Sequence, residues 1–369
     1  MTINIGISMA PVARPASEST PWRAARSIMA TRLLDCLNLN TEAVPSGWER
    51  FASDMAAANK AQYNEWSAKL KPLRVSGAGE SDLCRYTAQC AQMGIKVEGK
   101  NLQRLYVANE TAQQTRELLR HGRGNVGDDI EASDHLSSRL TQGARSFNKA
   151  LGAEATRPRK AAVAVQFGAG HCGEYAMVAT HVHSGYLQPG RVVEHVGSKQ
   201  ADHNWAEEIS ATGLTADDDI IIDGWGKGCP VLRKHSAFGA DPAKVEPQYG
   251  YSDASGNRQF ARDLLRPAPT EEYTAKFNNY EMDKDHVWAP TPVISKAFVA
   301  EVNARQESGI EKLAKMGWAV GASSQAIIAK ARGNKEILIA GARRDLEQLP
   351  PLARKIEYAP PEAAQVTAL

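Results

Sequence analysis

The sequence has 369 residues, of which 43% are apolar and 23% charged, a composition typical of a globular protein with one large domain or two modest ones. The formal net charge of +2 is too small to indicate nucleic acid or a membrane surface as the main partner, and no apolar run approaches the roughly 18 residues of a spanning helix. Five widely spaced cysteines argue against a disulfide framework and for a reducing compartment.

The first 40 residues differ in composition from the rest of the chain. They are rich in Ser, Thr, Pro and Ala, and no acidic residue precedes Glu18. They lack the apolar core of a secretory signal peptide and the Met-Gly start of a myristoylation site. Composition favours a disordered terminus over residues 1–40. It also fits a non-cleaved export signal of the kind that injection-type secretion systems read.

Residues 41–155 are predicted to be mainly helical. Aromatic and apolar residues recur at roughly helical intervals over 46–70, which indicates a stripe that faces a core. Similar patterns cover 101–121 and 132–152. The second of these is expected to begin at Ser133 or Asp134 and to end at Gly152.

The stretch "GRGNVG", Gly122–Gly127, literally matches a dinucleotide-binding pattern. It follows a predicted helix instead of a strand, and Asp128 and Asp129 come directly after it, where their charges would repel a pyrophosphate. We interpret it as a loop between two helices.

Residues 156–270 are expected to contain a small sheet. A connector over 154–160 and a short apolar run, "KAAVAVQF", precede three strand candidates. The candidates are residues 190–197, 203–209 and 217–225. Residues 241–269 are rich in Pro, Gly, Asp and Ser, and they are predicted to form a long irregular segment. Helical patterns return within 271–369, over 291–320 and 323–349, so the predicted fold class is α+β.

The stretch "QFGAGHCGEYAMVATHVH" places Cys172 between glycines, at the predicted first turn of a helix. A thiol attacks in its thiolate form, which a helix N-terminus and a neighbouring imidazole favour. Gly168, Gly170 and Gly173 are expected to keep side-chain bulk away from the sulfur, so that a substrate can approach. For a cysteine taken alone, buried packing is the alternative.

The predicted base is His203, oriented by Asp223. His203 opens the candidate strand 203–209, and Asp223 closes the next apolar strand. If the two strands form an antiparallel hairpin, the midpoint between the two residues falls on Gly213, and the hairpin places the imidazole beside the carboxylate.

An acyl-transfer site also needs donors for a developing oxyanion. The backbone N–H of Cys172 and the side chain of Gln166 are the candidates; for Gln166, a polar residue at the end of a buried strand is the alternative. Trp205 and Trp225 are expected to form walls that exclude water. With Gly173, these residues make up the predicted substrate-binding set.

Metal binding is the competing interpretation, since several histidines lie near Cys172 in the sequence. Neither a C-x-x-C pair nor an H-E-x-x-H motif is present, and His181 and His183 are two residues apart on a predicted helix, so they point to different faces. We therefore predict no metal and no other cofactor. Cys84 and Cys90 are expected to be unpaired, and Cys229 to be structural.

The motifs "GHCGEYA", "HNW" and "DGWG", in the order Cys172, His203, Asp223, resemble the transglutaminase-like core of the papain-like cysteine enzymes. More narrowly they resemble the HopX/AvrPphE family of type III effectors, which plant-associated bacteria inject into host cells. The narrow likeness is concentrated in residues 167–228.

This resemblance implies a papain-like, transglutaminase-type core over 156–270, in which the Cys-bearing helix packs on a small antiparallel sheet. Helical regions would flank it over 41–155 and 271–369. It implies Cys172, His203 and Asp223 as the catalytic triad and residues 1–40 as a secretion leader. The partners would be a host plant protein as substrate and a secretion chaperone at the N-terminus.

The expected activity is thiol-dependent acyl chemistry, with the thioester passing to water, as in a protease or deamidase, or to an amine, as in a transglutaminase. The sequence leaves these outcomes open, and glycan-amide hydrolysis is a third. From another class of function, the alternative is a non-catalytic module that binds a host protein through a transglutaminase-like scaffold.

Overall fold

The computed structural model describes residues 81–213, 218–319, 324–356 and 358, and all of them belong to one unit, Trp66–Leu369. The predicted leader over 1–40 and the aromatic stripe over 46–70 lie outside the described residues. The predicted boundaries at 155/156 and 270/271 both fall within this unit.

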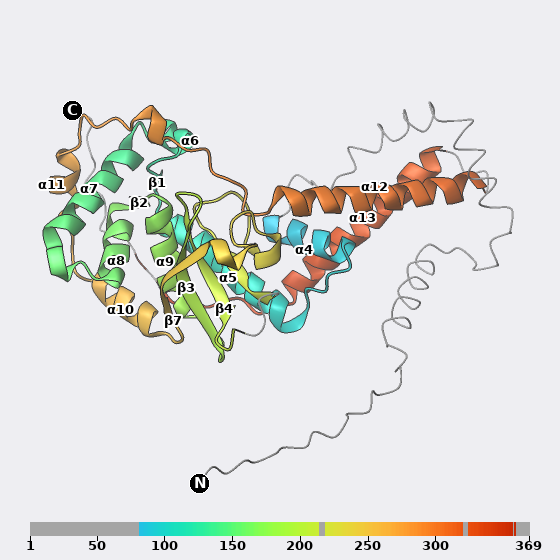
Figure 1. Cartoon of the computed structure of the whole chain (residues 1–369), viewed down its shortest axis with the longest axis horizontal. Coiled ribbons are helices and arrows are strands. Elements are labelled where there is room, and N and C mark those ends of the chain that lie inside the picture. Colours follow the sequence, from blue (N-terminus) through green and yellow to red (C-terminus); the bar gives the residue numbers. More distant parts are fainter. Residues whose placement is uncertain (1–80, 214–217, 320–323, 357, 359–369) are drawn as a thin grey trace, which may run out of the picture. The chain divides into compact units, whose positions relative to one another are not determined.

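The described part of the chain combines helices with an antiparallel sheet, which confirms the α+β prediction (Figure 1). The helices are α4 (Asp82–Gln92), α5 (Gly99–Leu118), α6 (Gly127–Ala132), α7 (Leu136–Leu151), α8 (Arg157–Phe167), α9 (Cys172–Ser184), α10 (Ser255–Leu264), α11 (Thr270–Ala275), α12 (Lys296–Ala319) and α13 (Ser324–Glu347). The strands are β1 (Gly122–Arg123), β2 (Ala169–Gly170), β3 (Arg191–Ser198), β4 (Asn204–Ser210), β5 (Ile220–Ile222), β6 (Val231–Leu232) and β7 (Val245–Tyr251).

The main sheet has the strand order β6-β5-β4-β3-β7, with every neighbouring pair antiparallel. The three predicted strands correspond to β3, β4 and β5. Helix α9 packs on β3 and β4, and α5, α8 and α10 flank it. Small and apolar residues surround α9, and every residue from Glu174 to Ser184 is buried, as expected for the central helix of a core.

The predicted hairpin forms, with a small difference in register. Ala206 pairs with Ile222 and Glu208 with Ile220, so the centre of the pairing is one residue beyond Gly213. Continued along the strands, this register places Asp223 opposite Trp205 instead of His203. The imidazole still reaches the carboxylate, because the two residues are diagonal neighbours at the open end of the hairpin.

Two predicted segments have a different structure. The connector and the apolar run of 154–167 form helix α8, which begins after Thr156, whose hydroxyl accepts a hydrogen bond from the N–H of Arg159. The irregular segment of 241–269 instead contains the edge strand β7 and helix α10. An edge strand tolerates Pro247, which can donate no ladder hydrogen bond.

Two smaller predictions concern the helix over 132–152. Its predicted start is wrong: α7 begins after His135, which has a left-handed backbone, and Ser133 instead ends α6. Its predicted end is correct, since α7 stops at Gly152. The helical patterns over 101–121, 291–320 and 323–349 are confirmed as α5, α12 and α13. No helix among the described residues is both long and apolar enough to cross a membrane.

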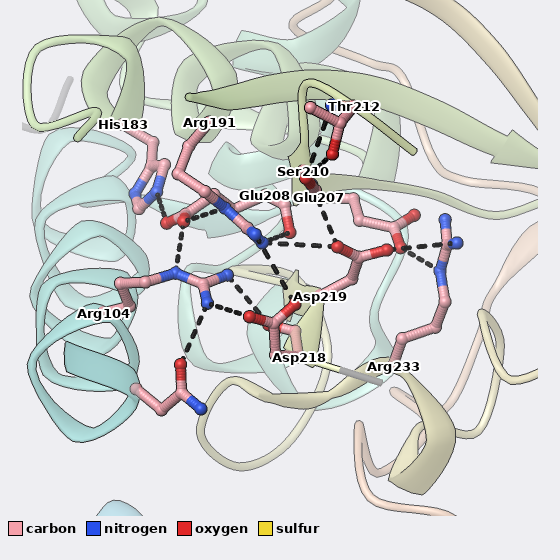
Figure 2. Close-up of polar contacts among 11 residues, drawn as sticks. Arg104, His183, Arg191, Glu207, Glu208, Ser210, Thr212, Asp218, Asp219 and Arg233 are labelled. Atoms are coloured by element: carbon pink, nitrogen blue, oxygen red, sulfur yellow. Dashed lines mark hydrogen bonds and ion pairs between the residues drawn. The ribbon is translucent and has the colours of Figure 1, made fainter. Parts of the chain in front are cut away.

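A buried network of charges joins the β4–β5 hairpin to the surrounding elements (Figure 2). Its centre is the Glu208 carboxylate, which accepts hydrogen bonds from Arg104 Nε at 2.6 Å, His183 Nε2 at 2.8 Å and Arg191 Nε at 3.1 Å. These donors come from α5, α9 and β3. Burial alone would raise the pKa of Glu208, but the hydrogen bonds and charges of His183 and Arg104 outweigh it and lower the pKa to about 2.

Replacing Glu208 tests how much this network stabilises the fold. Because the folded-state pKa lies below the unfolded value of 4.5, the stabilisation is present above about pH 4.5 and is lost as the pH falls towards 2. We expect Glu208→Gln to lower the free energy of unfolding by about 3 kcal/mol at pH 7, and the difference from wild type to shrink in acid. Urea denaturation at a series of pH values measures both.

The neighbouring Glu207 supplies the control. It is ion-paired with Arg233, and burial raises its pKa to about 6, so its contribution to the pH dependence has the opposite sign. The Glu207→Gln variant should therefore lose stability below pH 4.5 as the wild-type protein does, because Glu208 is still present. Parallel pH profiles for Glu208→Gln and wild type would contradict the role of Glu208.

Candidate active site

The chain approaches Cys172 through a short parallel pairing of β2 with β1, in which Ala169 lies opposite Gly122 and Gly170 opposite Arg123. The loop Gly122–Gly127 thus connects two helices, as interpreted from the sequence, and also borders the site. Its Asn125 side chain accepts a hydrogen bond from Trp225 Nε1 at 3.1 Å. No sequence signal indicated this contact, since it depends on a pairing between distant segments.

The three glycines around Cys172 have different roles. Gly168 has a left-handed backbone, and a Cβ there would lie 2.7 Å from the His121 ring. A Cβ on Gly170 would lie 2.5 Å from the Cβ of Glu174. Only Gly173 adjoins open space, with nothing within 4 Å of a Cβ. The prediction of substrate clearance therefore fits Gly173, whereas the other two glycines are required by packing.

Cys172 is the first residue of α9 and is 8% exposed. The N–H of His171 donates to Glu174 Oε2 at 2.9 Å, and the Glu174 carboxylate receives two further hydrogen bonds, both 2.9 Å, from Arg145 of α7. Burial would raise the pKa of Glu174, but the Arg145 charge outweighs it and lowers that pKa. The start of the helix is thus anchored beside the sulfur.

His203 and Asp223 lie together, as predicted, with Nε2 of the imidazole 2.8 Å from Oδ2 of the carboxylate. The other oxygen, Oδ1, accepts the backbone N–H groups of Trp225 at 2.9 Å and Gly226 at 2.8 Å. The turn after β5 therefore folds around the Asp223 side chain. A Cβ on Gly226 would lie 2.6 Å from Oδ2, so this turn needs glycine there.

Arg116 of α5 holds the same turn from outside. Its guanidinium donates to the carbonyl oxygens of Gly224 at 3.0 Å, Gly226 at 3.2 Å and Gly228 at 3.0 Å. These carbonyl groups meet the Arg116 side chain only in the folded structure. In the sequence this arginine is indistinguishable from one on a solvent-exposed helix face, so it was not predicted.

Aromatic rings enclose His203. The centroid of its ring lies 5.8 Å from that of Trp205, 5.2 Å from that of Trp225 and 4.3 Å from that of Phe238. Trp205 and Trp225, the two predicted walls of the site, are both buried beside His203. Phe238 was not predicted.

The charge on His203 is strongly favoured. Burial would lower the pKa of His203, but the charge and hydrogen bond of Asp223, with a hydrogen bond to Cys172, raise it to about 10. Since Asp223 occupies Nε2, Nδ1 is the nitrogen left for the thiol. An imidazolium beside a thiol stabilises the thiolate, the form that attacks carbonyl carbon.

Gln166 lies away from the sulfur. It belongs to α8, and its Nε2 donates to the carbonyl oxygens of Leu264 at 3.0 Å and Arg266 at 2.8 Å, at the end of α10. Both amide hydrogens therefore have acceptors elsewhere. The prediction of Gln166 as an oxyanion donor is wrong because the segment that carries it is a helix, whose side chain at this position points to α10.

The other cysteines have a different environment. Burial raises the pKa of the Cys90 thiol to about 12 and raises that of Cys229 further. Cys84 is also buried. Within the described residues, no group of three or more His, Cys, Asp or Glu side chains is arranged to hold a metal ion.

The contribution of Asp223 to the charge of His203 can be measured directly. In Asp223→Asn the amide oxygen can still accept the backbone N–H groups, but the negative charge is gone while the burial remains. We expect the pKa of His203 to fall from about 10 to its ordinary value of 6.5 or below. NMR titration of histidine-labelled protein gives this value. Asp241→Asn, at an exposed acid, is the control, and an unchanged pKa in Asp223→Asn would disprove the coupling.

Comparison of the chain with protein-family models, with curated proteins and with solved structures finds no match. The resemblance to the HopX/AvrPphE family therefore stays a prediction.

Proposed function

We propose that this protein is a cysteine enzyme that transfers or hydrolyses an acyl group of a protein substrate, with Cys172 as nucleophile, His203 as base and acid, and Asp223 as the orienting carboxylate. The observation that carries the proposal is the continuous arrangement of these three side chains. His203 Nε2 lies 2.8 Å from the buried Asp223 carboxylate, and the Cys172 thiol is among the groups that raise the pKa of the imidazole.

The steps follow from this geometry. The Cys172 sulfur attacks an amide carbonyl carbon, and the carbonyl electron pair moves to oxygen. His203 holds the thiol proton and gives it to the leaving amine, so that the C–N bond breaks and a thioester remains. Water, deprotonated by His203, then releases a carboxylic acid, or an amine forms a new amide. The Asp223 carboxylate keeps the imidazole oriented throughout.

The fold and the likeness of the motifs extend the proposal. A Cys-bearing helix packed on an antiparallel sheet, followed in sequence by the His and Asp strands, supports a papain-like, transglutaminase-type core. The motifs around the three residues support membership of the HopX/AvrPphE family. On that basis we propose a type III effector that acts on a host plant protein inside the host cell.

A non-catalytic module that binds a host protein is the second candidate. The observation that favours it is the low exposure of Cys172, at 8%, because a sulfur this enclosed serves equally well as packing. The two candidates differ in the reactivity of the thiol.

Alkylation of the wild-type protein by iodoacetamide, with the modified cysteine located by peptide mass spectrometry, separates them. At pH 6 we expect Cys172 to react on the order of ten-fold or more faster than glutathione, because a free thiol is mostly protonated there. Cys90 and Cys229 are controls within the chain and should react slowly, since burial raises their pKa values.

His203→Ala should abolish the rapid reaction of Cys172 at pH 6, with the fold checked by circular dichroism. A Cys172 that labels no faster than glutathione, with the pH profile of an ordinary thiol, would favour the binding module. In that case Cys172→Ala should leave binding to a host protein unchanged.

A further inference from the structure

The first residue of β4, Asn204, directs a side-chain amide at the sulfur. Its Nδ2 lies 4.0 Å from Cys172 Sγ. Asn204 follows His203 in the chain, and His203 itself lies just before the strand. Cys172 thus has the imidazole of one residue and the amide of the next within reach.

The orientation of this amide is fixed from the other side. Asn204 Oδ1 accepts a hydrogen bond from Gln248 Nε2 of β7 at 2.9 Å. Between the two strands lies Gly197 of β3, which pairs with Asn204 on one side and Glu246 on the other. A Cβ on Gly197 would lie 3.1 Å from Asn204 Oδ1 and 3.2 Å from Gln248 Nε2, so the glycine leaves room for the two amides to meet.

We propose that Asn204 Nδ2, together with the backbone N–H of Cys172, forms the oxyanion hole of the enzyme. The inference rests on the proposed function, and it assigns to Asn204 the role that the sequence suggested for Gln166. The N–H of Cys172 is in the first turn of α9, where a helix offers no internal acceptor.

The distance suits this role. In a tetrahedral intermediate the oxygen sits two bonds from the sulfur, and an effective donor lies about 3 Å from that oxygen. A donor 4.0 Å from the sulfur can lie about 3 Å from this oxygen when the oxygen is to one side of the line between the two atoms. Because Gln248 holds Oδ1, the amide presents its N–H without first having to rotate.

Two small reagents distinguish oxyanion binding from thiol activation. With p-nitrophenyl acetate, the sulfur bonds to carbonyl carbon, an oxyanion forms, and its collapse expels p-nitrophenolate to leave an acetyl thioester on Cys172. With iodoacetamide, the sulfur displaces iodide from a saturated carbon, and no oxyanion forms. The ratio of the two rate constants at Cys172 therefore reports the oxyanion hole alone.

In Asn204→Ala we expect acetylation of Cys172 to slow on the order of 10²-fold, with little change in alkylation. Asn204→Leu removes the donor while roughly keeping the size and adding no charge, and it should lose acetylation in the same way. Gln248→Ala should produce a smaller loss, since the donor remains but is no longer held. Gln166→Ala is the matched control: its amide hydrogens bind α10, so it should leave the ratio unchanged.

The outcomes separate this inference from the function on which it rests. If wild-type Cys172 reacts no faster than glutathione with either reagent, the proposed function fails, and the oxyanion hole with it. If wild-type Cys172 is reactive but the Asn204 variants lose neither reaction, or lose both equally, only the role of Asn204 is overturned. Circular dichroism confirms folding, and Gln248→Ala still tests the inference if the Asn204 variants do not fold.

Discussion

The site depends on the burial of a single carboxylate. The side chain of Asp223 is 1% exposed, and a carboxylate removed from water is costly unless its oxygens receive hydrogen bonds. One oxygen is satisfied by His203, and the other by the backbone of the turn that follows. The hydrogen bonds that the buried Asp223 carboxylate requires therefore determine the conformation of the turn and the orientation of the imidazole. The same carboxylate favours the charged form of His203.

Helix α5 connects this carboxylate with the second buried charge cluster of the molecule. Arg104, near its start, binds Glu208 and Asp218, and Arg116, near its end, holds the turn after Asp223. The two arginines thus grip opposite ends of the same β4–β5 hairpin. The spacing of the two arginines along α5 matches the distance between the two ends of the hairpin. The hairpin that carries His203 and Asp223 is therefore held against α5 at both ends. The proposed catalytic geometry requires such support, because small displacements of the reacting groups would slow the chemistry.

The sequence predicted the pieces of the site whose signal is local. Cys172 follows a glycine-rich stretch at a helix start. The apolar strand before Asp223 indicated a hairpin in which the predicted partner of Asp223 differs from the observed one by two residues. Helix α8 was not predicted, because a short apolar run fits a buried helix and a buried strand equally well. That error also misplaced Gln166. Arg116 and Asn204 act through contacts with carbonyls and a sulfur from distant segments, for which the sequence holds no pattern.

Because two arginines of α5 hold opposite ends of the hairpin, the number of residues between them is constrained. Arg104 and Arg116 are twelve residues apart, which is about 18 Å of helix and about three and a third turns. One residue inserted between them would rotate the second arginine by about 100° relative to the first, and either the charge cluster or the turn would lose its partner. Most of the intervening residues are buried, and Thr111 among them lies 2.9 Å from Nδ1 of His183, which belongs to the charge cluster. The number of residues between Arg104 and Arg116 therefore cannot change by one without the loss of one set of contacts.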